Sequence, residues 1–216
     1  DGTVVVIFQP AEEGGAGAKA MVDDGLLTRW GIEEVYGMHN YPGLPVGKFA
    51  LRPGPLMAAA DRIHIVLEGV GGHAARPHFS VDPILAGCAV VQACQQIVSR
   101  NVDPLKSAVL SITMFQGGST DNVIPETVEL RGTARTLDAD VRDLVERRLH
   151  EVVDQTAAAH GAKASVTYFR DYPVTVNDHD KAAFAADVAA EVSGEAQVER
   201  ALAPVMGGED FSFMLE

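Results

Sequence analysis

The pattern of apolar residues at the start of the chain predicts a buried strand, a helix and two further strands. Residues 3–8 are an unbroken run of apolar and β-branched residues, which is typical of a strand buried on both faces of a parallel sheet. Residues 16–27 predict a helix. Residues 35–39 and 46–51 predict strands, with turn-forming residues between them.

The middle of the chain alternates between strand and helix patterns in the order β-α-β-β-α-β. Apolar residues at every second position indicate the strands, and apolar residues three or four positions apart indicate the helices. Asp138 is the expected N-cap of the second helix and Gly161 its C-terminal stop. This order predicts an antiparallel sheet with two helices on one face. The predicted segments are strand 62–68, helix 81–100, strands 108–115 and 127–136, helix 141–160 and strand 164–169.

We therefore expect an α/β protein of two domains. Residues 57–172 contain the β-α-β-β-α-β unit, which has the size of a compact domain. Residues 1–56 and 173–216 flank this unit and include a predicted helix at 179–193. We expect the two flanks to form together one part of an α/β domain, into which the middle of the chain is inserted.

The net charge and the cysteines indicate which partners and which cellular compartment to expect. The chain has 216 residues and a formal net charge of −13. A polyanionic surface repels nucleic acids and anionic membranes, so neither is expected as a partner. There is no apolar run of transmembrane length and no signal-peptide pattern. Cys88 and Cys94 point to different faces of one predicted helix, and we expect them to be buried, reduced thiols. A soluble, cytoplasmic protein is the expectation.

Two acidic residues follow the first predicted strand directly. Glu12 and Glu13 lie at its carboxyl end, where α/β folds place their ligands. Their side chains diverge, so one can bind a cation while the other acts as a base. The alternative is a solvated loop whose acidic residues cap the helix at 16–27. His39 ends the next predicted strand and is a further candidate ligand, although a single histidine at a strand end is more often structural.

Two glycine-rich connections and a strand end supply polar side chains suited to a substrate. His73 is flanked by small residues and can donate a hydrogen bond to a developing oxyanion. Asn122 can hydrogen-bond a carboxylate or a carbonyl, and Arg135 can clamp a carboxylate with two hydrogen bonds. The structural alternatives are local hydrogen bonds for His73, a turn position for Asn122 and a surface ion pair for Arg135. Glu209 and Asp210 follow two glycines and are expected to interact with the dipole of a helix N-terminus.

Six motifs, taken together and in order, resemble the M20 family of metallopeptidases and amidohydrolases. The resemblance covers the whole chain and is greatest to the aminoacylase-like branch, which includes hippurate hydrolases and IAA-amino acid hydrolases. The motifs are Gln9-Pro10-Ala11-Glu12-Glu13-Gly14, Gly37-Met38-His39-Asn40, Leu44-Pro45-Val46-Gly47, Gly71-Gly72-His73-Ala74-Ala75, Asn122-Val123-Ile124-Pro125 and Gly208-Glu209-Asp210-Phe211.

The resemblance implies a fold, a cofactor and a reaction. The flanks would form part of a zinc-peptidase-like catalytic domain with a dinuclear metal site, and the inserted, ferredoxin-like domain would serve as lid and dimerisation module. Two divalent ions are implied, zinc or manganese, with cobalt and nickel also suited to carboxylate and imidazole ligands. The implied reaction of the homodimer is hydrolysis of an N-acyl amino acid to a carboxylate and a free amino acid.

The resemblance also implies a role for each candidate residue. Glu12 would be the general base that activates the attacking water, and Glu13 and His39 would be metal ligands. His73 would stabilise the tetrahedral intermediate, and in related enzymes the equivalent residue often reaches the site of the partner subunit. The substrate's carboxylate would be held by the remaining two candidates, Asn122 and Arg135.

Two elements of the family pattern are not found in this sequence. They are the upstream His-x-Cys-Gly-His-Asp-type element, which supplies further ligands, and a histidine that follows the Gly208-Glu209-Asp210-Phe211 motif. Open catalytic zinc sites normally keep three protein ligands. We therefore expect an internal fragment of a longer enzyme, with an incomplete metal site and no activity of its own.

Two other functions fit the same residues. One is a non-catalytic dimerisation or binding module derived from the same ancestor. A reading frame without an upstream metal-binding element would favour this module. The other is a dipeptidase or carbamoyl-amino-acid hydrolase of the same family, which a substrate panel separates from an N-acyl amino acid hydrolase. The sequence fixes neither the acyl group nor the amino acid of the substrate.

Overall fold

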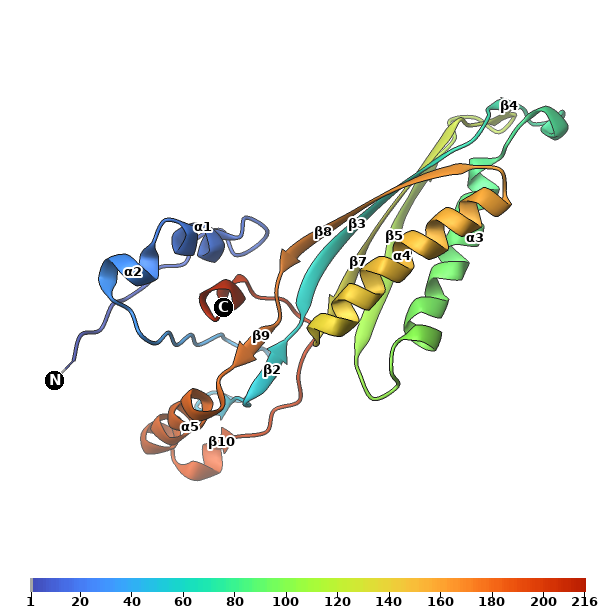
Figure 1. The fold of residues 1–216 in the computed structure, drawn as a ribbon. Coiled ribbons are helices and arrows are strands. Elements are labelled where there is room, and N and C mark those ends of the chain that lie inside the picture. Colours follow the sequence, from blue (N-terminus) through green and yellow to red (C-terminus); the bar gives the residue numbers. More distant parts are fainter. Residues whose placement is uncertain (1) are drawn as a thin grey trace. The chain divides into compact units, whose positions relative to one another are not determined.

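The computed structural model describes residues 2–216, which form a mixed α/β protein of two compact units (Figure 1). Unit 1 combines residues 2–59 with residues 172–216, and unit 2 is Ala60–Asp171. The two ends of the described chain therefore belong to the same unit.

Unit 2 is a four-stranded sheet with strand order β5-β7-β3-β8, and two long helices cover one of its faces (Figure 1). All six elements predicted for this region are confirmed, with small shifts at their ends. The connections contain the 3₁₀ turn η1 (Pro77–Phe79) and the π-type turn η2 (Ile97–Asn101), which ends the first helix early. The main elements are β3 (Ala59–Glu68), α3 (Pro83–Gln96), β5 (Ala108–Gly117), β7 (Thr127–Thr136), α4 (Ala139–Ala159) and β8 (Lys163–Tyr172).

The alternation of residues along β3 places the core of unit 2. Ile63, Ile65 and Leu67 are fully buried, because side chains two positions apart point to the same face of a strand. They pack against the helices, where Val145 and Leu149 of α4 are equally buried. Burial of each such side chain stabilises the fold by roughly 1.5–3 kcal/mol.

Capping residues set the ends of the two helices. The Asp138 carboxylate accepts hydrogen bonds from two backbone N–H groups of the first turn of α4, and Gly161 adopts a φ of 74° just beyond its last turn. Both predicted helix boundaries are confirmed. In α3 the carboxylate of Asp82 has the same capping role and Pro83 occupies the first helical position, which explains why this helix begins later than predicted.

Unit 1 consists of short elements joined by long irregular segments. Two small strand pairs are present, β1 with β10 in parallel and β2 with β9 antiparallel. The elements of unit 1 are α1 (Gly17–Asp23), α2 (Leu26–Trp30), β1 (Phe49–Ala50), β2 (Gly54–Met57), β9 (Thr175–Asn177), α5 (His179–Ser193), η3 (Glu195–Gln197), β10 (Val198–Glu199) and the 3₁₀ helix η4 (Asp210–Met214).

The prediction of a buried parallel strand at residues 3–8 is wrong. The segment forms no strand within the described chain, and the side chains of Val4, Val6 and Phe8 are 89%, 72% and 85% exposed. A strand needs a ladder of hydrogen bonds to a neighbour, and no such ladder joins residues 3–8 to another described segment. The apolar run instead lines one side of a cavity of about 920 Å³. Residues 30–38 line another side of the same cavity.

The other predictions for the first 56 residues hold only in part. Residues 35–39 form no strand, and of the strand predicted at 46–51 only β1 remains. The helix predicted at 16–27 is divided into α1 and α2, because Gly25 between them has a φ of 84°, a backbone conformation that interrupts a helix.

The cysteines differ in their environments. Cys94 is buried as expected, and burial raises the pKa of its thiol to about 11. Cys88 is exposed, which contradicts the prediction, because its position on α3 faces away from the sheet. Both are free thiols.

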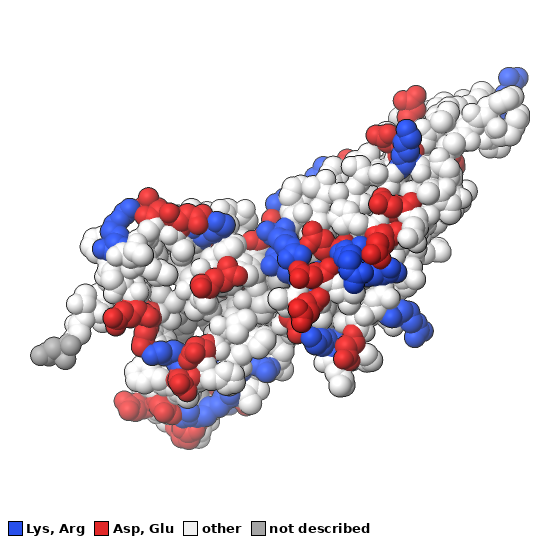
Figure 2. Space-filling model, in the orientation of Figure 1, with Lys and Arg blue, Asp and Glu red and all other residues white. Residues whose placement is uncertain are grey.

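Charged side chains of opposite sign are interspersed on the face of the molecule shown in Figure 2. Arg170 of β8 illustrates this pattern, since its guanidinium lies 2.7 Å from Asp143 and also 2.7 Å from Glu146, both on α4. Among the described helices, none has the length and apolar character needed to cross a membrane.

Candidate functional site

Three carboxylates of unit 1 converge. Glu12, Glu209 and Asp210 each present one oxygen, and these oxygens lie within 4.8 Å of one another. Glu12 comes from the loop before α1, and the other two come from the start of η4. Asp210 is fully buried and the other two are half-buried. Like charges this close repel one another, so a cation among them would stabilise the group. Hard divalent ions prefer carboxylate oxygens as ligands.

The electrostatic environment suits Glu12 to proton transfer. Burial raises the pKa of the Glu12 carboxyl above its ordinary value. The negative charges of Glu209, Glu13 and Asp210 raise this pKa further, and His39 opposes them. A carboxyl whose pKa is moved toward neutral pH is better matched to the role of a general base.

His39, a predicted ligand, reaches the same group of carboxylates. Its Nε2 atom lies 3.7 Å from a carboxylate oxygen of Glu209, and its Nδ1 lies 2.5 Å from the carbonyl oxygen of Asn40. Because that carbonyl can only accept, Nδ1 carries the proton. Nε2 of a neutral ring then offers a lone pair, and a histidine that binds a metal commonly has its other nitrogen fixed in this way.

Glu13, the other predicted ligand, does not join the three converging carboxylates. Its side chain is exposed, because adjacent residues of the loop point in different directions. Glu209 and Asp210 take part instead. The expectation for Glu209 is also confirmed, since its carboxylate caps η4 by accepting a hydrogen bond of 3.0 Å from the N–H of Phe211.

Asp210 ties the Glu12 loop to the C-terminal part of unit 1. Its Oδ2 accepts a hydrogen bond of 2.8 Å from the backbone N–H of Ala18. The amide of Gln9 donates to Oδ1 of Asp210 and, at 2.8 Å, to Glu209. Two of the three converging carboxylates, those of Glu209 and Asp210, are therefore held by protein donors. Gln9 is the first residue of its motif, and no local pattern indicates these contacts, which join residues about 200 positions apart.

In unit 2, a small strand pair holds His73 beside Asn122. The strands β4 (Gly72–His73) and β6 (Val123–Ile124) are antiparallel, with His73 opposite Val123. The backbone N–H of Ala74 donates to the carbonyl of Asn122 at 3.0 Å. The structure thus brings together two of the predicted site residues, and both side chains are exposed.

The local hydrogen bonds leave donors available on both side chains. Nδ1 of His73 accepts a hydrogen bond of 3.1 Å from the backbone N–H of Ala75, so the proton of the neutral ring lies on Nε2. Oδ1 of Asn122 accepts a hydrogen bond of 3.2 Å from the hydroxyl of Thr120. Among the described residues, none accepts from the imidazole N–H or the amide NH₂ group, so both can donate to an oxyanion or a carboxylate.

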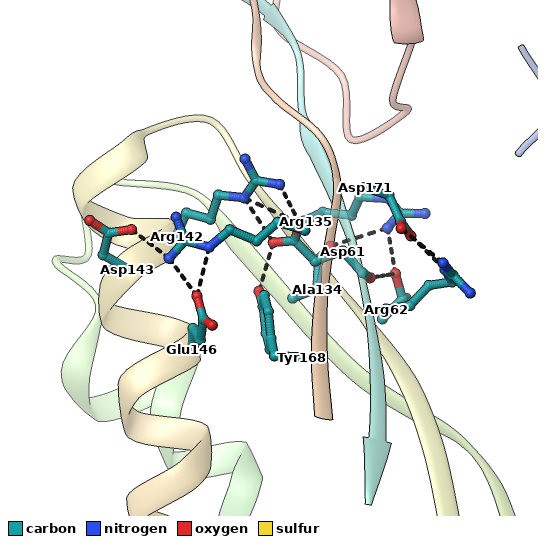
Figure 3. A network of polar contacts seen from close by, with 11 residues as sticks. Asp61, Arg62, Ala134, Arg135, Arg142, Asp143, Glu146, Tyr168 and Asp171 are labelled. Carbon is teal, nitrogen blue, oxygen red and sulfur yellow. Dashed lines mark hydrogen bonds and ion pairs between the residues drawn. The ribbon is translucent and has the colours of Figure 1, made fainter. Parts of the chain in front are cut away.

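Arg135 lies near the C-terminal end of β7, in the four-stranded sheet of unit 2. Its Nη1 donates to the hydroxyl of Thr133 and, at 3.1 Å, to the carbonyl of Ala134 (Figure 3). The hydroxyl of Thr133 in turn donates to the carbonyl of Asp61 at 2.8 Å. At about 3.4 Å per residue along a strand, Arg135 is more than about 20 Å from Asn122, which precedes β7. Within one copy of unit 2 the two predicted carboxylate-binding residues are not brought together.

The whole chain matches a known family model and known enzymes. The model of peptidase family M20/M25/M40 matches residues 1–216. An N-acetyl-L-cysteine deacetylase of Bacillus subtilis is 45% identical over 215 residues, covering 100% of this chain and 50% of that protein. A hippurate hydrolase of Campylobacter jejuni is 39% identical over 216 residues, covering 100% of this chain and 56% of that protein. The chain thus spans about half the length of the curated relatives it matches.

A solved structure agrees with this match. The YXEP protein of Bacillus subtilis, described as a dinuclear metal binding peptidase from the M20 family, is 36% identical to this chain. The two superpose with a TM-score of 0.78, over 96% of this chain and 51% of that one.

Proposed function

This chain belongs to the M20/M25/M40 peptidase family, and on that premise we propose that the protein containing it is a metal-dependent hydrolase of N-acyl amino acids. The products would be a carboxylate and a free amino acid. The observation that carries this proposal is the convergence of the carboxylates of Glu12, Glu209 and Asp210, together with the position of His39 Nε2, 3.7 Å from Glu209. Relatives named for deacetylating N-acetylcysteine and for hydrolysing hippurate support the substrate class.

The residues present fit a site for divalent ions. We propose zinc or manganese first, with cobalt and nickel as alternatives. His39 and the carboxylate of Glu209, which faces it, would hold an ion. Glu13 stays the second ligand predicted from the sequence, and its exposed side chain lies outside the three converging carboxylates. Bound divalent ions supply Lewis-acid stabilisation of negative charge and make a water molecule easier to deprotonate. The fixed tautomer of His39, with its proton on Nδ1, supports its role as a ligand through Nε2.

The chain's own residues would move the protons and bind the substrate. Glu12 takes a proton from the attacking water and passes it to the leaving amine. The N–H of His73 donates to the oxyanion of the tetrahedral intermediate. Asn122 and Arg135 hold the carboxylate of the amino acid, Arg135 by two hydrogen bonds.

The separation of these residues supports a dimer. A small substrate cannot touch both Asn122 and Arg135 of one copy of unit 2, because they lie more than about 20 Å apart along the strand. We propose that unit 2 is the lid and dimerisation domain, and that His73 and Asn122 of one copy serve the site of the other copy. Residues 1–216 on their own would be inactive, a proposal supported by relatives of about twice their length.

The test is a hydrolysis assay on chelator-treated natural protein with and without added Zn²⁺ or Mn²⁺. The substrates are N-acetyl-L-cysteine, hippurate, a dipeptide and an N-carbamoyl amino acid. Metal-restored release of the amino acid from the first two supports the proposal. Preference for the dipeptide or the carbamoyl compound would instead favour those activities of the family. Metal binding without turnover of any substrate would favour a non-catalytic module.

A further inference from the structure

The side chain of Tyr172 contacts the loop that carries Glu12. Its hydroxyl donates a hydrogen bond to the carbonyl oxygen of Glu12 and accepts one of 3.1 Å from the backbone N–H of Gly14. Tyr172 is buried, and its ring packs edge-on against that of Phe213, with centroids 6.1 Å apart. One hydroxyl thus binds both sides of the turn that follows Glu12.

This loop has a backbone that needs such support. Ala11 and Ala16 have φ values of 53° and 48°, in the left-handed region, which costs a residue other than glycine roughly 1–2 kcal/mol. At Gly17 the backbone packs so closely that a Cβ atom would lie 1.8 Å from the carbonyl oxygen of Pro10. Strained backbone at a functional site persists only when surrounding contacts hold it.

Tyr172 is also placed where the chain passes from unit 2 to unit 1. It is the last residue of β8 and the first residue of the second segment of unit 1. Along the chain, Tyr172 therefore joins β8 to the segment of unit 1 that follows it.

We propose that Tyr172 is a positioning residue that holds Glu12 in place for proton transfer, an inference that rests on the proposed role of Glu12 as general base. The hydroxyl acts through the backbone of Glu12 and does not touch the substrate. Loss of the hydroxyl lets the turn at Glu12 move, and displacement of a reacting group by as little as about 1 Å can reduce turnover by about 100-fold.

The test compares Tyr172→Phe with Tyr168→Phe. Tyr168 lies on the same strand and is half-buried, and its hydroxyl donates at 2.7 Å to Asp61 of unit 2, outside the Glu12 loop. Each variant loses one hydrogen-bonded hydroxyl and keeps its ring, so both are expected to remain folded. Two measurements are made on the natural protein: hydrogen exchange of peptides covering residues 9–17, and kcat and KM for hippurate.

We expect Tyr172→Phe to speed exchange in residues 9–17 and to lower kcat by about tenfold or more, with KM changed by less than about twofold. Tyr168→Phe should change neither. If hydrogen exchange of residues 9–17 is unchanged in Tyr172→Phe, the hydroxyl does not hold the Glu12 loop. If exchange is faster but kcat is unchanged, Tyr172 holds the loop and has no positioning role in turnover. A wild type without turnover would contradict the proposed function and, with it, the positioning role. The exchange data would still decide whether Tyr172 holds the loop.

Discussion

The Nε2 atom of His39 lies 3.7 Å from a carboxylate oxygen of Glu209, although the two residues are far apart in the sequence. Because the Nδ1 proton of His39 is donated to the carbonyl of Asn40, Nε2 is the ring nitrogen that faces this carboxylate, and in a neutral ring it would carry a lone pair. This arrangement is favourable only if Nε2 is protonated or if a cation lies between the two groups. It leads to a direct prediction about metal affinity.

His39→Ala should lower the affinity of the protein for Zn²⁺ and Mn²⁺ by at least about tenfold, because it removes a ligand of the proposed site. The matched control is His179→Ala, an exposed histidine at the start of α5 in the same unit, which should leave the affinity unchanged. Equilibrium dialysis with metal analysis measures both. Equal affinities in His39→Ala and in the wild type would remove His39 from the site.

The pH dependence of stability should report on Glu12. Its pKa is raised by burial above the ordinary value of 4.5, so the folded protein holds this proton more tightly than the unfolded chain does. Stability contributed by the protonated group is present at low pH and is lost as the pH rises from about 4.5 through the raised pKa. In chelator, Glu12→Gln should therefore gain stability relative to the wild type as the pH increases.

Urea denaturation between pH 4 and pH 8 measures this difference, with and without a divalent ion. Added metal should reduce the advantage of Glu12→Gln, because a cation offsets the repulsion among the carboxylates. A difference between variant and wild type that does not change with pH would mean that Glu12 has no raised pKa in the folded protein.

Unit 2 contains a buried ion pair whose loss should be costly. Asp61 is completely buried, and its carboxylate accepts hydrogen bonds from the guanidinium of Arg142 on α4 at 2.5–3.1 Å (Figure 3). Removing one partner leaves an uncompensated buried charge, so Arg142→Met should destabilise the protein by about 3–5 kcal/mol. Arg147 on the same helix forms an exposed pair with Glu151, and Arg147→Met should cost much less. Urea denaturation measures the free energy of unfolding of both variants. A similar decrease in the two would contradict the prediction that the buried pair matters more than the exposed one.

Subunit complementation tests the exchange of residues between copies. If His73 serves the site of the partner copy, His73→Ala and Glu12→Gln should each be nearly inactive. A refolded equimolar mixture should regain roughly a quarter of wild-type activity, because half of the symmetric dimers would be mixed, each with one intact site. A mixture as inactive as its components would place His73 and Glu12 of the same copy in one site.

The elements of unit 2 could be predicted because their determinants are local. Alternation along β3 and the Asp138 cap of α4 lie within the segments they define. The errors concern residues 3–8 and 35–39, whose apolar character also predicted strands. Whether an extended segment becomes a strand depends on a hydrogen-bonded neighbour, and sequence periodicity carries no information about that neighbour.

The candidate site likewise combines features that local sequence indicates with contacts between residues far apart in the chain. The motif chemistry pointed to Glu12, His39, His73 and Asn122, because each follows or ends a predicted strand or lies in a glycine-rich connection. It did not place Glu209 beside Glu12, nor Tyr172 against the Glu12 loop. These contacts join residues that are more than 150 positions apart, and only the fold brings them together.

The central claim, that Glu12 is the base of a metal-dependent hydrolase, is tested most directly by the turnover of hippurate in Glu12→Gln and wild-type natural protein, with bound metal measured in both. We predict that the variant keeps its metal and loses kcat by about 100-fold to 10,000-fold, the range expected for a general base. A variant that keeps both its metal and its kcat, or a wild type whose turnover survives complete removal of metal, would contradict the claim.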